Sequence, residues 1–345
     1  MKKKIVLIYG GHRCEHDVSI LSAFSVLSSI YYDNYEVQTV FISPKGKWIK
    51  GPYLTNKPIS PNILHLSNTS KNISPCQIKT LGAIAFPVLH GPMGEDGTIQ
   101  GFLEILEMPY IGAGVLASAC AMDKIISKHL LQGVGIPQVP FVPVLKKIWL
   151  ENPGSILEKI NNLIYPLYVK PANMGSSVGI TRIEDSSGLQ EALDTAFKYD
   201  FRALIEQGIK AREIEVGILG NEDIKITDAG EIIKDVAFYD YNAKYIDNKI
   251  QMKISAKIPE KIHHQACEYA KKAYEILAGS GLARCDFFLT ANNELFFNEL
   301  NTMPGFTQFS IFPLLWENMG LKCQDLIEEL IQLAEKRFAK RQSYF

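Results

Sequence analysis

The stretch RCDFFLTANNELFFNELN, residues 284–301, has the residue types and spacing with the clearest chemical use. Arg284 and Asp286 are two residues apart and therefore share one face of a predicted strand. Glu299 and Asn301 share one face of the next strand in the same way, and a hairpin between the strands would bring Asp286 close to Glu299. Two carboxylates and an amide oxygen suit Mg²⁺, which takes its other ligands from water and phosphates. A solvated polar face is the alternative. The opposite face is expected to carry Cys285, Phe287, Leu289, Phe296 and Asn298.

Two glycine-containing turns could bind charged groups. HGPMGEDGTIQG, residues 90–101, follows a predicted strand and opens a helix, whose N-terminus favours an anion. His90 and Glu95 could equally be ordinary turn residues. Glu15 lies in GGHRCEHDVSILSA at the first strand-to-helix turn, where a carboxylate is suited to an ammonium group. Capping of that helix is the alternative role of Glu15, although Asp17 is better placed for it.

Two lysines are candidates for phosphate contacts. VKPANMGSSVGI, residues 169–180, has glycines, a lysine and serines, but not in the order G-x-x-x-x-G-K-[ST] of a P-loop. Lys170 ends an apolar strand, which favours a phosphate contact over simple solvation. Lys124 lies on a predicted helix, where an exposed lysine is normally solvated. We expect residues 173–177 to form a flexible turn between two antiparallel strands.

The composition is that of a globular protein of two or three domains. The chain has 345 residues, of which 47% are hydrophobic and 21% charged. The net charge of -1 leaves no broad electrostatic attraction to nucleic acid or to acidic membranes. The six cysteines are scattered without metal-ligand spacing. No apolar run approaches the roughly 18 residues of a membrane span, and the first is too short for a signal peptide, so we expect a cytoplasmic protein.

The chain changes character along its length. Strands and helices alternate over residues 1–120, which predicts a parallel α/β domain with its site at the strand C-termini. Residues 43–80 are rich in Pro, Asn, Ser and Lys and are expected to form a peripheral excursion or small hairpin. A helix over 117–131 and short antiparallel strands then predict an α+β domain over about 123–215. The expected strands are 5–9, 37–42, 83–89, 109–112, 139–145, 167–170, 179–184, 203–207 and 213–219, with helices near 153–163 and 187–198.

The last third of the chain combines a loop with regular elements. The segment FYDYNAKYIDNKIQMK, residues 238–253, has no periodicity and is expected to be a long functional loop. An amphipathic helix over 259–277 follows it. A hairpin of strands 283–289 and 294–299 and a helix over 321–340 complete the predicted elements.

These motifs together resemble the D-alanine–D-alanine ligases of the ATP-grasp superfamily. The resemblance is carried by GGHRCEHDVS, HGPMGEDGTIQG, MDK, YVKPANMGSSVG, LIEQGIKAREIEV, FYDYNAKY and RCD…NELNTMPGFTQFS, in this order. It covers nearly the whole chain apart from residues 43–80. The implied fold class is α/β and α+β multidomain, an ATP-grasp fold with an N-terminal Rossmann-like parallel α/β domain. The implied domains are 1–122 for substrate binding, 123–215 as the central ATP-grasp domain, and 216–345 for metal and substrate binding.

The resemblance implies a set of nucleotide and metal contacts. Lys124 and Lys170 would hold the phosphates of ATP, and Lys244 would lie on the loop that closes over the site. The adenine-contacting hinge would comprise Glu206, Gln207, Gly208 and Ile209, with Glu213 on the ribose. Two Mg²⁺ (or Mn²⁺) ions would be bound by Asp286, Glu299 and Asn301.

The resemblance also implies the substrate contacts. Glu15 would orient the first D-alanine through its ammonium group, in a network with Ser176 and Tyr245, and His90 would lie close to the same substrate. The second D-alanine would contact Ser310 and Ile311. Arg284 and the Gly305 amide would form the oxyanion site.

The implied reaction is the ATP-dependent joining of two D-alanines through a D-alanyl phosphate, for peptidoglycan precursor synthesis. The alternatives are a ligase of the same superfamily that adds D-lactate or D-serine, or one with another acceptor. Tyr245 favours D-alanine as the second substrate, because ligases that add D-lactate or D-serine often differ in this loop. A catalytically silent nucleotide-binding protein is the contrasting possibility. The family is commonly dimeric, so the expected partners are D-alanine, ATP and a second copy of the chain.

Overall fold

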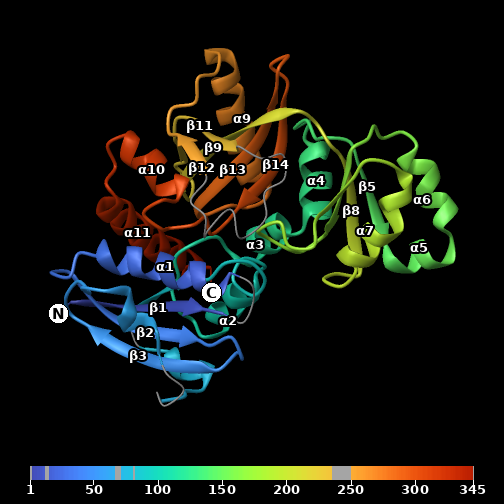
Figure 1. Cartoon of the computed structure of the whole chain (residues 1–345). Helices are drawn as coiled ribbons and strands as arrows, with labels where there is room; N and C mark the ends of the chain where they lie inside the picture. The colour runs from blue at the N-terminus through green and yellow to red at the C-terminus, as the bar shows by residue number, and fades with distance from the viewer. Residues whose placement is uncertain (1, 12–14, 67–70, 81, 235–249, 345) are drawn as a thin grey trace.

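The protein was analysed as a computed structural model, which describes residues 2–11, 15–66, 71–80, 82–234 and 250–344. Three sheets organise these residues (Figure 1). The described ranges leave out residues 235–249, so most of the expected loop at 238–253, with Lys244 and Tyr245, lies outside the described residues.

The first sheet belongs to the predicted parallel α/β unit. Its strand order is β3-β2-β1-β4, and β1 pairs in parallel with both β2 and β4, as predicted. The excursion at 43–80 begins as a hairpin, because β3 pairs antiparallel with β2. The strand expected at 109–112 is reduced to a single bridge between Ala85 and Tyr110. The elements are β1 (Lys3–Gly10), α1 (His16–Ser28), β2 (Tyr35–Ile42), β3 (Trp48–Leu54), η1 (Pro61–Leu64), η2 (Pro75–Ile78), β4 (Ala83–Val88) and α2 (Thr98–Ile105).

The second sheet is antiparallel, in the order β5-β8-β6-β7, and has its own apolar core. The strand expected at 213–219 does not join this sheet. That strand, β9, pairs with β11 and β13 of the third sheet instead, because its buried residues pack in the core of the third sheet. The elements are β5 (Phe141–Leu145), α5 (Lys146–Glu151), α6 (Pro153–Ile160), β6 (Leu167–Pro171), β7 (Thr181–Ile183), η3 (Ser186–Gly188), α7 (Leu189–Ala196) and β8 (Arg202–Gln207).

The helix expected over 117–131 is two helices, α3 (Val115–Met122) and α4 (Lys124–Gly133). Asp123 separates them with an extended backbone, at φ -82° and ψ 104°. Its side chain accepts hydrogen bonds from the backbone N–H groups of Ile125 and Ile126, the usual role of an N-cap aspartate. The break makes Lys124 the first residue of a new helix rather than one position within a long one.

The third sheet is the largest, in the order β12-β11-β9-β13-β14, with β10 paired to β9. The prediction of a loop up to residue 253 is wrong for residues 250–253, which form β12 by pairing antiparallel with β11. The elements are β9 (Ala211–Gly220), β10 (Lys225–Ile226), β11 (Gly230–Lys234), β12 (Ile250–Lys253), α9 (Glu260–Ile276), β13 (Gly281–Thr290), β14 (Leu295–Asn301), α10 (Ile311–Asn318) and α11 (Cys323–Gln342).

The first and third sheets are joined through a shared core. Apolar residues of β1 and α1 pack in one cluster with buried residues of α10 and α11 (Figure 1). Arg337 of α11 is half-buried and donates hydrogen bonds to the backbone oxygens of Tyr110 and Gly112. These contacts hold the segment between α2 and α3 against α11.

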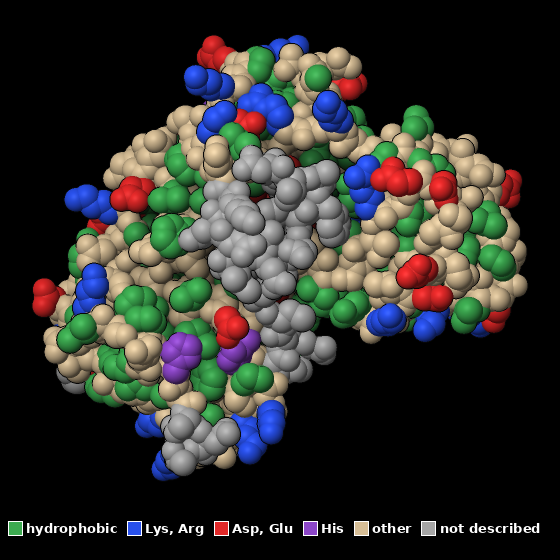
Figure 2. Space-filling view, viewed as in Figure 1, with side chains coloured by type: hydrophobic (Ala, Val, Ile, Leu, Met, Phe, Trp, Pro, Cys, Tyr) green, Lys and Arg blue, Asp and Glu red, His purple; other side chains and the backbone are tan. Residues whose placement is uncertain are grey.

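The outer surface carries charges of both signs. In the space-filling view, Lys and Arg side chains alternate with Asp and Glu over the described part of this face (Figure 2). This distribution agrees with the small net charge of the sequence. Among the described residues, no helix has both the length and the apolar character needed to cross a membrane.

Candidate active site

The predicted hairpin is present with the predicted register. β13 and β14 pair so that Asp286 lies opposite Glu299, and Arg284 lies opposite Asn301. The neighbouring strand β9 adds Glu215 opposite Asp286 on the other side. Three adjacent strands therefore place a row of carboxylates across one face of the third sheet.

A register shift in this hairpin changes which residues face the core. Asp286 pairs with Glu299, but the next residue, Phe287, pairs with Phe297, so β14 carries one extra residue there. Phe297 is fully buried, and its ring lies 6.0 Å from that of Phe287 at an angle of 84°. The expectation that Phe296 and Asn298 face the core is therefore wrong, because strict alternation does not continue through the extra residue.

Arg284 is bound on both sides by carboxylates. Its Nε and Nη2 donate to the two oxygens of Asp286, each at 2.7 Å, and Nε lies 2.9 Å from Oε2 of Glu215. Asn301 Nδ2 donates to Asp286 Oδ2 at 3.0 Å. Burial favours the neutral guanidine, but the two carboxylates outweigh it and keep the pKa of Arg284 well above its ordinary value. The guanidinium is thus held in one orientation by a bidentate contact.

The charge of this face suits divalent cations. Four carboxylates, those of Glu213, Glu215, Asp286 and Glu299, come from β9, β13 and β14. Burial raises the pKa of Asp286, and Glu299 and Glu213 add to that effect, while Arg284 opposes it. Within the described residues, no three His, Cys, Asp or Glu side chains converge as a metal site. The donor types fit Mg²⁺, so the metal assignment stays a prediction that rests on charge and residue type.

A buried ion-pair cluster lies next to the end of β8. Glu206 is ion-paired with Lys170 of β6 and, at 2.5 Å, with Lys128 of α4. The side chains of Lys128 and Glu206 are each only 3% exposed. The pKa of Glu206 is lowered to about 2. Burial alone would raise this pKa, but the charges of the two lysines have the larger effect. The carboxylate therefore stays ionised and holds Lys170 in place.

Lys128 is a residue that sequence reasoning missed. It lies four residues after Lys124 on α4, so both lysines are on one side of the helix. Burial lowers the pKa of both lysines, although Glu206 and Glu299 oppose this. The i,i+4 spacing to Lys124 was the available signal, but it gave no indication that Glu206 would be the partner.

The predicted adenine hinge connects the second and third sheets. It runs from Glu206 at the end of β8 to the start of β9, and its backbone is anchored by the Gly208 N–H, which donates to Pro166 O at 2.7 Å. A Cβ at Gly208 would lie 2.7 Å from the same oxygen, so the close approach requires glycine. The side chain of Glu206 faces the lysines rather than the hinge, and Gln207 Oε1 accepts from Ile164 N at 3.0 Å.

Glu15 and Ser176 meet in the structure although 161 residues separate them, and the Ser176 hydroxyl donates a hydrogen bond to Glu15 Oε1. Gly91 also lies against this carboxylate, because a Cβ there would be 2.0 Å from Glu15 Oε2. Glu95 accepts from the Gly91 N–H at 2.6 Å, and burial together with Glu15 raises the pKa of Glu95. Sequence reasoning left Glu95 undecided between a site residue and a turn residue; the structure places it half-buried beside Glu15.

His90 is fixed by two hydrogen bonds. Its Nδ1 lies 3.1 Å from the backbone oxygen of Met303, and its Nε2 lies 3.1 Å from Ser22 Oγ. A carbonyl oxygen only accepts, so Nδ1 carries the hydrogen. Burial lowers the pKa of His90 to about 4, against the Met303 contact that raises it. The imidazole is therefore neutral, and Ser22, which sequence reasoning missed, sets its orientation.

The low pKa of His90 predicts a pH dependence of stability. In the unfolded chain His90 has its ordinary pKa of 6.5. Between about pH 6.5 and pH 4, the unfolded chain therefore binds a proton on His90, and the folded protein does not. Stability is expected to fall by about 3 kcal/mol over this interval as the pH decreases. Urea unfolding at pH 7 and pH 4 should show this difference in the wild type but not in His90→Asn. The exposed His264→Asn serves as control, and an equal loss in His90→Asn would contradict the assignment.

The segment before α10 brings Gly305 and Ser310 together. A Cβ at Gly305 would lie 2.7 Å from Ser310 Oγ, and that oxygen accepts from the Thr307 N–H at 3.0 Å. Ser310 precedes the first turn of α10, whose N–H groups favour an anionic group. Ile311 is buried, so its side chain contributes to the core, and only its backbone could contact a ligand.

The site residues thus form two neighbouring groups. In the first, Ser176 and Gly91 lie against the Glu15 carboxylate, and His90 directly precedes Gly91 in the chain. In the second, lysines surround Glu206, and Arg284 lies on the face of the third sheet. The effect of Arg284 on His90 links the two groups electrostatically. Within the second group, Glu299 acts on Lys124. This arrangement can bind an ammonium group at Glu15 and phosphates at the lysines.

Known proteins match this chain over most of its length. Sequence profiles described as the D-ala D-ala ligase N-terminus and C-terminus match residues 4–113 and 130–332. A D-alanine--D-alanine ligase of Enterococcus faecalis is 65% identical over 97% of this chain and 99% of its own length. The corresponding protein of Streptococcus gordonii is 53% identical over 99% of both chains.

Two solved structures have similar folds. The D-alanine-D-alanine ligase from Coxiella burnetii is 31% identical, with a TM-score of 0.85 over 99% of this chain and 97% of that chain. The VanG D-Ala:D-Ser ligase from Enterococcus faecalis is also 31% identical, with a TM-score of 0.86 over 97% of this chain and all of that chain.

Proposed function

This chain belongs to the D-alanine–D-alanine ligase family, and we propose on that premise that it joins two D-alanine molecules with the conversion of ATP to ADP and phosphate. Its fold is accordingly the ATP-grasp fold. The observation in the site that carries the proposal is the meeting of Glu15 with Ser176 beside the lysine cluster. That arrangement suits an amino acid whose ammonium group is held while its carboxylate approaches a phosphate.

The reaction has two steps, a phosphoryl transfer and an acyl transfer. A carboxylate oxygen of the first D-alanine attacks the γ-phosphorus of ATP, and the bond from that phosphorus to the bridging oxygen of ADP breaks. The amine nitrogen of the second D-alanine then attacks the carbonyl carbon of the acyl phosphate. The carbon–oxygen bond to phosphate breaks, phosphate leaves, and the nitrogen loses a proton. Phosphorylation is needed because a free carboxylate is a poor acyl donor.

The charged residues of the site have distinct parts in these steps. Lys124 and Lys170 contact the phosphates, and Glu206 keeps Lys170 in place. Glu213 would bind the ribose. Asp286, Glu299 and Asn301 would hold two Mg²⁺ (or Mn²⁺) ions, which when bound neutralise charge on the transferring phosphoryl group. Arg284 and the Gly305 N–H face the developing oxyanion, a role in which one donor contributes several kcal/mol.

Ser176→Ala is expected to weaken binding of the first D-alanine. Glu15 loses a charge-assisted hydrogen bond that helps to orient it, so the KM for D-alanine at the first site should rise about tenfold. The KM for ATP should stay within twofold, and both constants come from steady-state ADP release. Ser187→Ala is the control, because it removes a similar but exposed hydroxyl contact, to Asp185. A change of less than twofold in the KM for D-alanine would contradict the role of Ser176.

The second substrate is D-alanine in this proposal, with D-lactate and D-serine as alternatives. The D-serine alternative has one specific support, the similarity to the VanG D-Ala:D-Ser ligase. Identity of 53–65% to D-alanine--D-alanine ligases favours D-alanine. Ser310 and the backbone at Ile311 would contact this substrate. The role of Tyr245, which lies outside the described residues, stays a prediction from the sequence.

A D-alanine-dependent ADP-release assay with product identification tests the proposed function. Purified protein, ATP and Mg²⁺ should release ADP only when D-alanine is added, and mass spectrometry should identify D-alanyl-D-alanine. Competition among D-alanine, D-lactate and D-serine across pH separates the alternatives. The proposal fails if D-alanyl-D-alanine is a minor product or if ADP release is independent of D-alanine.

The setting of the reaction follows from its substrates. ATP is supplied in the cytoplasm, where we place the enzyme, and the dipeptide would enter peptidoglycan precursor synthesis. The homodimer stays a prediction, for which sedimentation equilibrium is the measurement.

A further inference from the structure

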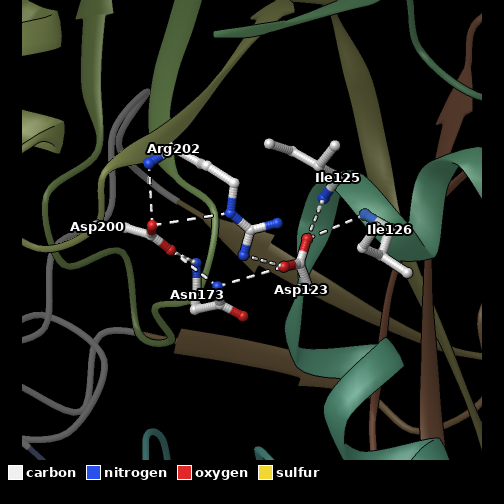
Figure 3. A network of polar contacts seen from close by, with 6 residues as sticks. All are labelled: Asp123, Ile125, Ile126, Asn173, Asp200 and Arg202. Atoms are coloured by element: carbon white, nitrogen blue, oxygen red, sulfur yellow. Dashed lines mark hydrogen bonds and ion pairs between the residues drawn. The ribbon is translucent and has the colours of Figure 1, made fainter. Parts of the chain in front are cut away.

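A closed ring of polar contacts joins the start of α4 to the loop after β6, and its side chains have no role in the function proposed above (Figure 3). Its members are Asp123, Asn173, Asp200 and Arg202, which we call the Asp123 ring. They come from the α3–α4 junction, the loop at 172–177 and the segment leading into β8. These three segments surround the position of Lys124.

Asp123 holds a helix and a loop with one carboxylate. Its Oδ1 accepts from the backbone N–H groups of Ile125 at 3.1 Å and Ile126 at 3.0 Å, which caps α4. Its Oδ2 accepts from Arg202 Nη2 at 2.5 Å and from Asn173 Nδ2 at 3.3 Å. The two oxygens thus have separate tasks, as Figure 3 shows.

Asp200 closes the ring from the other side. Its Oδ2 accepts from both the backbone N–H of Asn173, at 3.1 Å, and the side-chain Nδ2, at 2.8 Å. Its Oδ1 accepts from the Arg202 backbone N–H at 2.9 Å. The side chains of Asp123 and Asp200 are only 9% and 7% exposed, and the Arg202 guanidinium lies between them. Removal of one member leaves buried polar groups of the others without a partner.

The ring is next to the contacts that Lys124 makes with the loop. The Lys124 backbone N–H donates to Ala172 O at 3.0 Å, and its Nζ donates to Met174 O. Asn173 lies between those two residues and is the one held by the ring. The beginning of the loop is therefore fixed to the helix that carries Lys124.

The far part of the loop depends on this anchor. Ser176 and Ser177 have left-handed backbones, with φ of 49° and 62°. Residues other than glycine rarely keep this conformation unless their surroundings hold it. Ser176 also reaches Glu15, so a shift at the start of the loop would displace a substrate contact.

We infer that the Asp123 ring positions the loop at 172–177 over the phosphates of the bound nucleotide, with Asp123 and Asn173 acting as positioning residues. The inference rests on the proposed function. It predicts that loss of the ring impairs use of ATP and exposes the acyl phosphate to water. Water would then attack the carbonyl carbon in place of the amine, releasing D-alanine and phosphate without dipeptide.

Two substitutions interrupt the ring at different points. Asp123→Asn keeps an N-cap of equal quality through Oδ1, but an amide NH2 group replaces Oδ2 and accepts no hydrogen bond from Arg202 or Asn173. Asn173→Ala removes the loop side of the ring and leaves the cap intact. Each is expected to lower kcat/KM for ATP about tenfold, because small misplacements of contact groups have effects of this order. Each should also increase the ADP released per dipeptide formed.

Asp185→Asn is the matched control. Asp185 also caps a helical turn of the same sheet region, accepting from Ser187 N at 2.8 Å, but it is exposed and belongs neither to the loop nor to the Asp123 ring. Its kcat/KM for ATP and its ADP-to-dipeptide ratio should equal those of the wild type. Melting temperatures measured for all variants separate loss of stability from loss of positioning.

The double variant Asp123→Asn with Asn173→Ala gives the decisive result. Both changes remove the same link, so the double variant should lose about tenfold in kcat/KM rather than about a hundredfold. A hundredfold loss of kcat/KM in the double variant would overturn the inference. The inference would also fail if the single variants melt at a lower temperature than Asp185→Asn but have a kcat/KM for ATP within twofold of it. A wild type that forms no dipeptide contradicts the proposed function instead. The ring is then tested by ATP affinity in calorimetry of the same variants, where unchanged affinity would overturn it.

Discussion

Glu299→Gln is expected to reduce dipeptide synthesis about a thousandfold, because it removes a carboxylate from the face where charge on the transferring phosphoryl group must be neutralised. About 4 kcal/mol of transition-state stabilisation corresponds to this factor. Glu299 lies opposite Asp286 in the hairpin, and it acts electrostatically on Lys124 and Lys170. The loss of one negative charge should therefore appear mainly as weaker metal binding and lower kcat.

The measurement is ADP release with D-alanine across a range of Mg²⁺ concentrations. The variant should need more Mg²⁺ for half-maximal rate and should not recover full activity. Glu294→Gln is the control, because Glu294 lies in the turn of the same hairpin and is exposed. Full Mg²⁺-dependent activity in Glu299→Gln would exclude the metal assignment.

Arg284→Lys should reduce kcat about a hundredfold while the protein stays folded. Lysine keeps the positive charge between Asp286 and Glu215 but cannot reproduce the two parallel hydrogen bonds to Asp286 at 2.7 Å. The lysine ammonium would not be held toward the oxyanion as the guanidinium is, and loss of one such donor typically has an effect of about 10²–10³ in kcat. The KM values should change much less than kcat.

Arg212→Lys tests whether that effect belongs to the site. Arg212 makes the same kind of bidentate contact in the same sheet, to Glu231 at 2.7 and 2.8 Å. Its replacement should leave kcat within twofold of the wild type. Steady-state kinetics and thermal melting of both variants provide the comparison. Equal losses in the two variants would mean that Arg284 supports the sheet rather than the reaction.

Local patterns in the sequence were sufficient for much of the fold. The alternation of β13 and β14 predicted the facing pair Asp286 and Glu299, which the register confirms. The parallel pairing of β1 with its neighbours and the α9 helix were also predicted correctly. These features depend on residues close together in the chain, so periodicity is enough to indicate them.

The incorrect predictions of secondary structure and strand pairing have a common cause. The helix over 117–131 is broken because Asp123 binds Arg202 and Asn173, which are far away in the sequence. β9 joined another sheet, and residues 250–253 became a strand, because each found its partners among distant strands. Propensity is a weak guide where such long-range pairing decides.

The sequence by itself determined the residue types of this protein's chemistry and their order, from Glu15 to Asn301, which is why the family could be recognised from motifs. Tertiary structure alone decided which of them meet. It buried Lys128 against Glu206 and brought Ser176 to Glu15. Burial and the distance between charges are properties of the folded chain, and they set the pKa values and orientations on which the chemistry depends.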